Sequence, residues 1–179
     1  MVAAPTTIER DMAGNARKLK DDLQAPSDIR FKNEGNVAFV TIDRPADGNR
    51  LTPSSLAHLR DIAIELAADR RTSCVVITGT GTEFFSSGIF NIELRAAYSK
   101  EDALEIVGLA IDAFNRIESL PQVVIGALNG AVRAGGGELA LACDFRICAS
   151  HATLAFHETN YACFPGAGAP VRLPSIIGA

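Results

Sequence analysis

Three short runs of apolar, largely β-branched residues restrict the fold of this chain more than any other feature. They span residues 37–42, 74–78 and 122–128, and each stops close to a glycine, proline or asparagine signal. Such runs are typical of β-strands, and the last two are continuous enough to predict strands covered on both faces. Helical patterns separate the three runs. The resulting order of strand, helix, strand, helix, strand predicts an α/β fold.

Two longer helices are predicted between these strands. The first begins after Thr52, which can cap it, with Pro53 in its first turn. Its apolar residues form one stripe, made of Leu56, Leu59, Ile62, Ala63 and Leu66. The second helix is predicted over residues 101–119. It is apolar on most of its circumference, so we expect it to be well buried.

The alternation continues toward the C-terminus, whereas the N-terminus is different. A short helix is predicted over residues 138–142, with strands near 145–149 and 153–156. The polar, charge-mixed start predicts an N-terminal arm over 1–28, either flexible or helical and packed on a partner subunit. Residues 29–179 then form the core, because a chain of 179 residues is long enough for one well-buried core.

Composition and charge exclude several functional classes. No apolar run approaches the roughly 18 residues that span a bilayer, and the N-terminus lacks a secretory signal, so we expect neither membrane insertion nor export. A net charge of −4 gives no electrostatic basis for binding nucleic acid. The four cysteines lack C-x-x-C spacing, which favours buried, reduced thiols in a cytoplasmic protein. They are Cys74, Cys143, Cys148 and Cys163.

The first candidate site is the glycine run Gly135-Gly136-Gly137 directly before Glu138. Glycines at the start of a helix remove every Cβ from backbone that approaches a ligand. The first amides of the helix have no internal partner and carry the positive end of the helix dipole. Such donors stabilise a developing oxyanion. The alternative is a tight turn between a strand and a helix, and the adjacent carboxylate favours function over that alternative.

The second candidate is Glu158, which follows His157 at the end of the predicted strand 153–156. A carboxylate beside Phe156 and Tyr161 would lose solvent, which would raise its pKa and suit it to proton transfer. Alone, a glutamate at such a place is more often a surface residue. The pair His157-Glu158 also begins the zinc motif H-E-x-x-H, but Tyr161 occupies the position of the second histidine, so that motif fails.

The third candidate is the segment 84–89, which follows the second strand. Loops at the carboxyl ends of strands are the usual ligand sites of open α/β sheets, although an irregular loop solvated by its two serines is the simpler interpretation. Other nucleotide and hydrolase motifs fail. Phe84 occupies the third glycine position of a dinucleotide fingerprint, no phosphate-binding G-x-x-x-x-G-K-[ST] is present, and the serines lack a G-x-S-x-G frame.

Four segments, taken in order, resemble the crotonase (enoyl-CoA hydratase/isomerase) superfamily. They are VTIDRP, VVITGTGTEFFSSGIF, VVIGALNGAVRAGGGELALACDFRICASHATLAF and FPGAGAPVRLPSIIG. The resemblance runs from about Phe31 to the last residue, and the third segment is long and specific. It implies a ββα spiral of the ClpP/crotonase type, usually assembled as a homotrimer or hexamer. It also implies an acyl-CoA substrate, with no metal and no cofactor beyond the coenzyme A of that substrate.

The resemblance further implies roles for individual residues. The amides of Ile89 and Gly135 would bind the thioester oxygen. Glu138 would act as base toward a water molecule and Glu158 would supply or remove the C2 proton, so that water adds across the 2,3 bond or leaves it. The remaining positions implied to contact the substrate are Ser87, Gly88, Phe90, Gly136, Tyr161, Pro165 and Gly166.

The sequence departs from the family pattern at several places near these residues. Ala134 stands at the family's first glycine, Ile89-Phe90-Asn91 replaces an Ala-Asp-Leu type of segment, and Pro170 offers no N–H. The acyl group therefore stays open. An enoyl-CoA isomerase or a C–C bond hydrolase of the same superfamily is the alternative function, and a non-catalytic interaction subunit is a further alternative. Family members continue into a C-terminal helical region, so we expect a truncated chain with apolar surface left uncovered.

Overall fold

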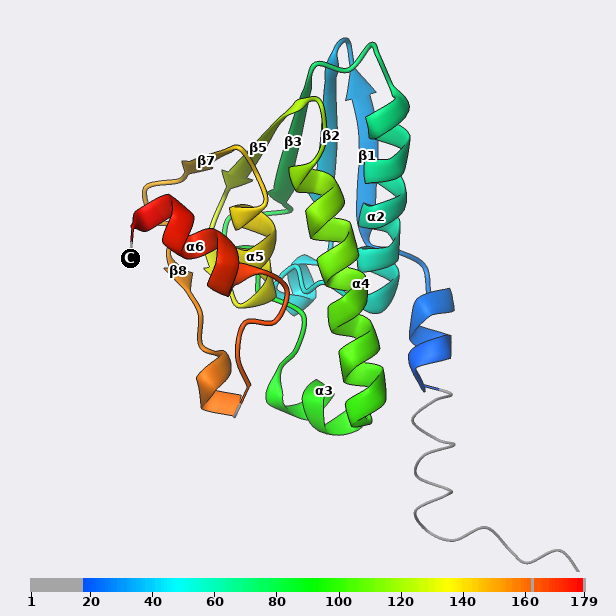
Figure 1. The fold of residues 1–179 in the computed structure, drawn as a ribbon, viewed down its shortest axis with the longest axis vertical. Coiled ribbons are helices and arrows are strands. Elements are labelled where there is room, and N and C mark those ends of the chain that lie inside the picture. Colours follow the sequence, from blue (N-terminus) through cyan, green and yellow to red (C-terminus); the bar gives the residue numbers. More distant parts are fainter. Residues whose placement is uncertain (1–17, 162, 179) are drawn as a thin grey trace, which may run out of the picture.

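The fold is known from a computed structural model that describes residues 18–161 and 163–178 (Figure 1). Five strands form the larger sheet in the order β1-β2-β3-β5-β7, in which only β1 and β2 are antiparallel. Three short parallel strands form a second sheet in the order β4-β6-β8. The strands are β1 (Ile29–Glu34), β2 (Val37–Ile42), β3 (Cys74–Gly79), β4 (Phe84–Ser86), β5 (Val123–Leu128), β6 (Ala131–Arg133), β7 (Phe145–Cys148) and β8 (Leu154–Ala155).

The chain alternates between the two sheets in a regular way. Each of β3, β5 and β7 joins the larger sheet, the next strand joins the smaller sheet, and one or two helices follow. The predicted α/β class and ββα spiral are therefore confirmed. The helices are α2 (Pro53–Ala68), α3 (Ile92–Ala97), α4 (Lys100–Glu118), α5 (Gly135–Leu141) and α6 (Ala169–Ile177), with short 3₁₀ turns η1 (Pro45–Asp47) and η2 (Glu158–Tyr161).

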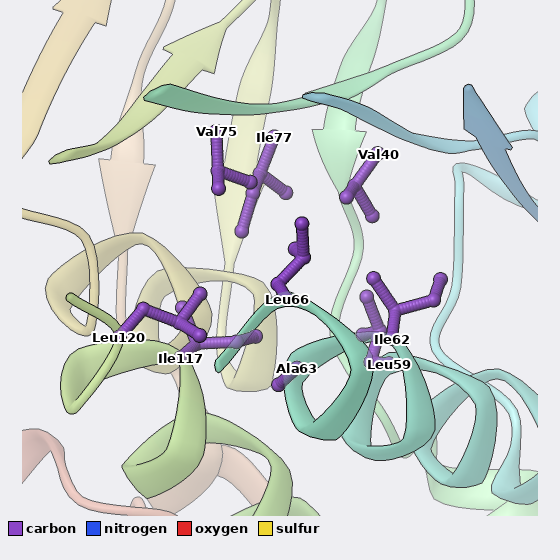
Figure 2. Close-up of a pocket in the computed structure, with 9 residues that line it drawn as sticks. All are labelled: Val40, Leu59, Ile62, Ala63, Leu66, Val75, Ile77, Ile117 and Leu120. Carbon is purple, nitrogen blue, oxygen red and sulfur yellow. The ribbon is translucent and has the colours of Figure 1, made fainter. Parts of the chain in front are cut away.

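Helices α2 and α4 lie side by side against one face of the larger sheet (Figure 1). The predicted start of α2 is confirmed, because the Thr52 side chain accepts a hydrogen bond from the Ser55 N–H at 3.1 Å. The predicted apolar stripe of α2 is fully buried. Figure 2 shows this seam, where side chains from β2, β3, α2 and the end of α4 enclose a gap of about 10 Å³. This gap is a packing defect of the core and is too small for a ligand.

Two burial expectations were wrong. Helix α4 is amphipathic rather than buried all round, and Leu104 in its first half is 62% exposed. Charged residues alternate with apolar ones along α4, so only one of its faces packs against α2 and the sheet. Strands β3 and β5 alternate between buried and less buried residues, and Val123 is exposed. The long helices cover a single face, so these strands are not covered completely on both sides.

The cysteines also differ in part from the expectation. All four are thiols rather than halves of disulfides, as predicted. Cys143 is buried, and burial raises the pKa of its thiol to about 12. Cys74 and Cys163 are half-buried, whereas Cys148 is exposed because β7 forms an edge of the larger sheet. Other apolar side chains near this edge are exposed as well, on β7, β8 and α6. They are Phe145, Ile147, Leu154, Val171 and Ile177.

Helix α5 begins at Gly135, three residues before the predicted start, so the glycine triplet belongs to the helix. The reason is close packing. A Cβ on Gly136 would lie 2.7 Å from the Ser86 carbonyl oxygen of β4, and a Cβ on Gly137 would lie 2.8 Å from the Phe156 ring. A Cβ on Gly135 would likewise lie 2.7 Å from the Ile89 side chain, so all three glycines allow α5 to pack closely against the protein itself.

Gly136→Ala should lower the free energy of unfolding by about 1–3 kcal/mol, because the new methyl group meets fixed backbone of β4. Gly108→Ala is the matched control, since Gly108 lies inside α4 with no atom near the added methyl group. That change should raise stability by about 0.5–1 kcal/mol. Urea denaturation of both variants measures the difference. Equal effects in the two variants would contradict the packing role of Gly136.

Part of the predicted N-terminal arm is described by the structure. Residues 18–24 are helical, and Leu19 is buried against the core. Residues 1–17 lie outside the described part of the chain. The boundary between an arm of 1–28 and a core of 29–179 stays a prediction. None of the helices in the described ranges is long and apolar enough to cross a membrane.

Candidate active site

A cavity of about 410 Å³ lies between α3, the first half of α4, the start of α5 and the chain that follows β8. Figure 1 shows α3 and the N-terminal end of α4 together at the bottom of the view, with η2 nearby. The volume is in the range of small-molecule sites. Both candidate glutamates and both candidate amide residues line it: Glu138, Glu158, Ile89 and Gly135.

Glu138 lies in the first turn of α5 and is only 3% exposed. Its Oε1 accepts hydrogen bonds from the Ala167 N–H at 2.7 Å and the Ala169 N–H at 3.1 Å. No described residue donates a hydrogen bond to Oε2. One carboxylate oxygen is therefore held by the protein, and the other is left for a ligand or water.

The pKa of Glu138 is raised above its ordinary value, and burial is the main cause. The two backbone N–H groups of Ala169 and Ala167 oppose this rise by stabilising the carboxylate. The charge of Glu158 adds to the rise, and the charge of Arg172 opposes it. A carboxylate with a raised pKa is a better proton acceptor than an ordinary surface glutamate.

Glu158 is the first residue of η2 and follows the end of β8 by three residues. Both of its carboxylate oxygens are buried, and neither accepts a hydrogen bond from any residue that the structure describes. Burying a carboxylate without partners is costly, so a native protein rarely leaves one in that state without a functional reason. The geometry therefore favours a ligand-facing role for Glu158.

The candidate amides lie close to each other. A Cβ on Gly135 would lie 3.4 Å from the Ile89 nitrogen, and a Cβ on Gly88 would lie 3.2 Å from the Gly135 nitrogen. Within the described part of the chain, neither the Ile89 N–H nor the Gly135 N–H donates a hydrogen bond. Gly135 opens α5, where the helix itself provides no partner for an N–H. Two neighbouring free donors at a cavity wall can bind one carbonyl oxygen.

Ala134, directly before these donors, has a strained backbone. Its φ of 48° and ψ of −124° are unusual for a residue with a side chain. Conformations of this kind cost about 1–3 kcal/mol and persist where the surrounding structure enforces them. The ψ angle of Ala134 sets the plane of the following peptide, so this strain fixes the direction of the Gly135 N–H.

The other implied contact residues divide into two groups. Phe90 and Gly166 line the cavity. Ser87, Gly88, Gly136 and Pro165 do not line it. Ser87 instead bonds to the Asp47 carbonyl, while Gly88, at φ 102°, packs against Ala134 and its carbonyl accepts from the Leu51 N–H. Tyr161 ends η2 beside the cavity, and its side chain lies outside the described part of the structure.

Arg172 is a site residue that the sequence did not reveal. It is buried on α6 and donates to the Ala167 carbonyl at 3.1 Å and to Glu118 Oε2 at 2.8 Å. These bonds hold the loop that carries the Glu138 partners against α4. Gly168 in that loop has φ 121°, and a Cβ there would clash with the guanidinium at 1.9 Å. In the sequence, the only sign of this contact is a glycine, Gly168, four residues before Arg172.

Pro170 does not weaken this arrangement, although it lacks an N–H. The donors to Glu138 are the amides of Ala167 and Ala169, so residue 170 is not needed as a donor. Basic side chains also reach the cavity from the opposite wall, where Arg95 of α3 and Lys100 of α4 line it. Among the described ranges, no group of three or more His, Cys, Asp and Glu residues could hold a metal ion.

The chain matches a known family and several named proteins. The family model described as enoyl-CoA hydratase/isomerase matches residues 32–179. YngF of Bacillus subtilis is 40% identical over 147 residues, which cover 82% of this chain and 56% of YngF. Crotonyl-CoA hydratase of Syntrophomonas wolfei is 34% identical over 154 residues, covering 86% of this chain and 59% of that protein. Short-chain-enoyl-CoA hydratase of Clostridium acetobutylicum is 33% identical, covering 85% and 58%.

Solved structures show the same relation. The crystal structure of enoyl-CoA hydratase from Bacillus anthracis superposes with a TM-score of 0.81 at 35% identity, covering 86% of this chain and 59% of that one. The structure of Pseudomonas aeruginosa DspI gives a TM-score of 0.81 at 32% identity, covering 86% and 62%. The chain thus spans less than two thirds of the length of these relatives. It belongs to the enoyl-CoA hydratase/isomerase family.

Proposed function

We propose that this chain carries the active site of an enoyl-CoA hydratase, which adds water across the 2,3 double bond of an acyl-CoA thioester. The observation that supports this most is the meeting of two carboxylates and two free N–H groups in one cavity. The carboxylates can move two protons, and the N–H groups can bind the thioester oxygen. The coenzyme A belongs to the substrate, and the proposal includes no other cofactor.

In the proposed reaction the thioester oxygen accepts hydrogen bonds from the Ile89 and Gly135 N–H groups. A water molecule transfers a proton to Glu138 Oε2 while its oxygen forms a bond to C3. The π electrons of the 2,3 bond move toward C2 and the thioester oxygen, where the N–H groups stabilise the charge. Each such donor contributes about 3–4 kcal/mol to the transition state. Glu158 then gives its proton to C2, and exchange with solvent restores both glutamates.

Hydration requires one glutamate as the base and the other as the acid. Their charges interact, since the Glu158 charge raises the pKa of Glu138. This interaction makes it unfavourable for both carboxylates to be charged at once. In the proposal Glu138 is the base, because the Ala167 and Ala169 N–H groups favour its charged form in opposition to burial, and Glu158 is the acid.

Two relatives support a short acyl group, because their names are crotonyl-CoA hydratase and short-chain-enoyl-CoA hydratase. We therefore propose a short 2-enoyl-CoA as the substrate. A cytoplasmic homotrimer or hexamer is part of the same proposal. Isomerisation of a 3-enoyl-CoA is the second candidate, because a relative from Zymoseptoria tritici is named as an isomerase/hydratase.

Purified protein should hydrate crotonyl-CoA, measured as the loss of the ultraviolet absorbance of the conjugated thioester. A 3-enoyl-CoA serves as the comparison, since isomerisation would instead create that absorbance. A melting temperature that rises with crotonyl-CoA gives an independent sign of binding. If the protein converts the 3-enoyl-CoA and not crotonyl-CoA, the function is isomerisation rather than hydration. Failure to bind or convert either thioester would reject both functions.

A further inference from the structure

The helical segment 18–24 contacts Tyr98, at the end of α3, although it lies outside the part of the chain that matches the family, which starts at residue 32. Its Asp22 accepts hydrogen bonds from the Tyr98 hydroxyl and from Lys18 Nζ, the latter at 2.8 Å. The Lys18 ammonium also lies over the Tyr98 ring, 4.8 Å from its centre. Three side chains therefore connect this segment to the end of α3.

Helix α3 needs such an anchor, because it has little packing of its own. None of its six residues is buried. Tyr98, which follows α3 directly, is only 7% exposed and belongs to the core. Short helices without a buried face are marginal in water, so tertiary contacts at their ends determine whether they stay in place.

Tyr98, which anchors the end of α3, is connected to the ligand cavity through two residues. The Tyr98 ring packs edge-on against the Phe90 ring, with centroids 6.2 Å apart, and Phe90 lines the cavity. Arg95, one turn of α3 before Tyr98, lines the cavity as well. A shift of Tyr98 would therefore move both the aromatic and the basic part of this wall.

The contact between Asp22 and Tyr98 persists over a wide pH range. Burial raises the pKa of the Tyr98 phenol well above its ordinary value, and the hydrogen bond to Asp22 and the charge of Asp22 add to the rise. The charge of Asp102 raises the pKa further, while that of Arg50 lowers it. The pKa of Asp22 is lowered in spite of its burial, by the hydrogen bonds from Lys18 and Tyr98. At neutral pH a phenol donor therefore meets a charged carboxylate, which is a strong form of hydrogen bond.

We propose that Asp22 and Tyr98 are positioning residues, through which segment 18–24 braces α3 and keeps the α3 wall of the cavity in place for the ligand. The identity of that ligand rests on the proposed function, whereas the brace itself does not. Neither side chain lines the cavity, so both act through Phe90 and Arg95. An ordered wall binds the substrate without first losing conformational entropy, so the brace should contribute to affinity more than to the chemical step.

The test compares Asp22→Ala and Tyr98→Phe with the wild type by hydrogen–deuterium exchange of the amides of α3. Both changes should raise the exchange rate of these amides about five- to tenfold, because each removes the hydrogen bond that holds the end of α3. Tyr98→Phe removes the hydroxyl but keeps the aromatic packing. Faster exchange of α3 in this variant therefore reports the lost hydrogen bond rather than general unfolding. Asp112→Ala is the matched control. It breaks the i,i+4 ion pair with Arg116 on an exposed part of α4, as Asp22→Ala breaks the i,i+4 pair with Lys18, and it should leave α3 unchanged.

Kinetics with crotonyl-CoA provide the second measurement. In the two brace variants KM should rise about three- to tenfold while kcat changes less than twofold, as expected for loss of binding shared by ground and transition states. Unchanged exchange of α3 would overturn the proposal, and so would faster exchange with an unchanged KM. If the wild type neither binds nor converts the thioester, the proposed function fails, and the exchange comparison still decides whether the brace exists.

Discussion

Glu158→Gln should lower kcat for the hydration of crotonyl-CoA by about 10²- to 10⁴-fold, the usual range for loss of a general acid. The amide that replaces the carboxyl group has nearly the same shape, but it has no acidic proton to give to C2. Folding should be little affected, because no described residue donates a hydrogen bond to the carboxylate oxygens of Glu158. The change therefore leaves no donor without its acceptor. Steady-state kinetics together with a thermal melt measure the two effects separately.

The control for this prediction is Glu105→Gln, which makes the same chemical change at an exposed position of α4 and should leave kcat unaltered. A Glu158→Gln variant that retained more than about a tenth of the wild-type kcat would exclude Glu158 as the proton donor. If that variant lost hydration but still converted a 3-enoyl-CoA, the second candidate function would gain support, because isomerisation can use a single base that moves one proton.

Much of the fold was predictable because its signals are local. Thr52 and Pro53 mark the start of α2 by themselves, and the stripe from Leu56 to Leu66 shows which face is buried. The three central strands are six residues long and rich in β-branched residues. In contrast, β4, β6 and β8 contain only two or three residues each, too few to show any period. Strands β4 and β6 were therefore missed, whereas β8 lies within the predicted strand 153–156.

The candidate site was predictable only in its outline. Glu138 and Glu158 were found from the glycine run and the strand end next to them, and the structure places both at one cavity. The hydrogen bonds that hold Glu138 come from Ala167 and Ala169, about thirty residues away, through backbone atoms that leave no sequence signal. The family resemblance implied that Gly136 contacts substrate, whereas it packs on Ser86. A glycine pattern shows that something approaches closely, and it does not show whether protein or ligand does so.

Glu138→Gln should also lower kcat by about 10²- to 10⁴-fold, in this case through loss of the general base toward water. The Gln side chain retains an Oε1 that can accept the hydrogen bonds of the Ala167 and Ala169 N–H groups, so the loop before α6 should keep its position. KM should consequently change less than kcat. An unchanged kcat would show that water is activated by another group, and a grossly raised KM would show that the charge of Glu138 is needed for the shape of the site.

The same variant should change how stability depends on pH. Burial raises the pKa of Glu138 in the native state above its ordinary value of 4.5. At pH values between 4.5 and this native pKa, the native state therefore binds more protons than the unfolded state. The contribution of Glu138 to the free energy of unfolding therefore falls as pH rises through that window, and its penalty is complete above the native pKa. Glu138→Gln removes this penalty. Urea denaturation at several pH values from about 4 to 8 should show the variant gaining stability over the wild type as pH rises.

The opposite slope would mean that the Ala167 and Ala169 N–H groups outweigh burial and hold Glu138 as a stabilised carboxylate. The effect also connects the two glutamates, because the charge of Glu158 is one cause of the raised pKa. In a Glu158→Gln background, the pH-dependent gain from Glu138→Gln should be smaller than in the wild type. An identical gain in both backgrounds would show that the two carboxylates titrate independently. The assignment of Glu138 as base and Glu158 as acid would then lose the support of their charge interaction.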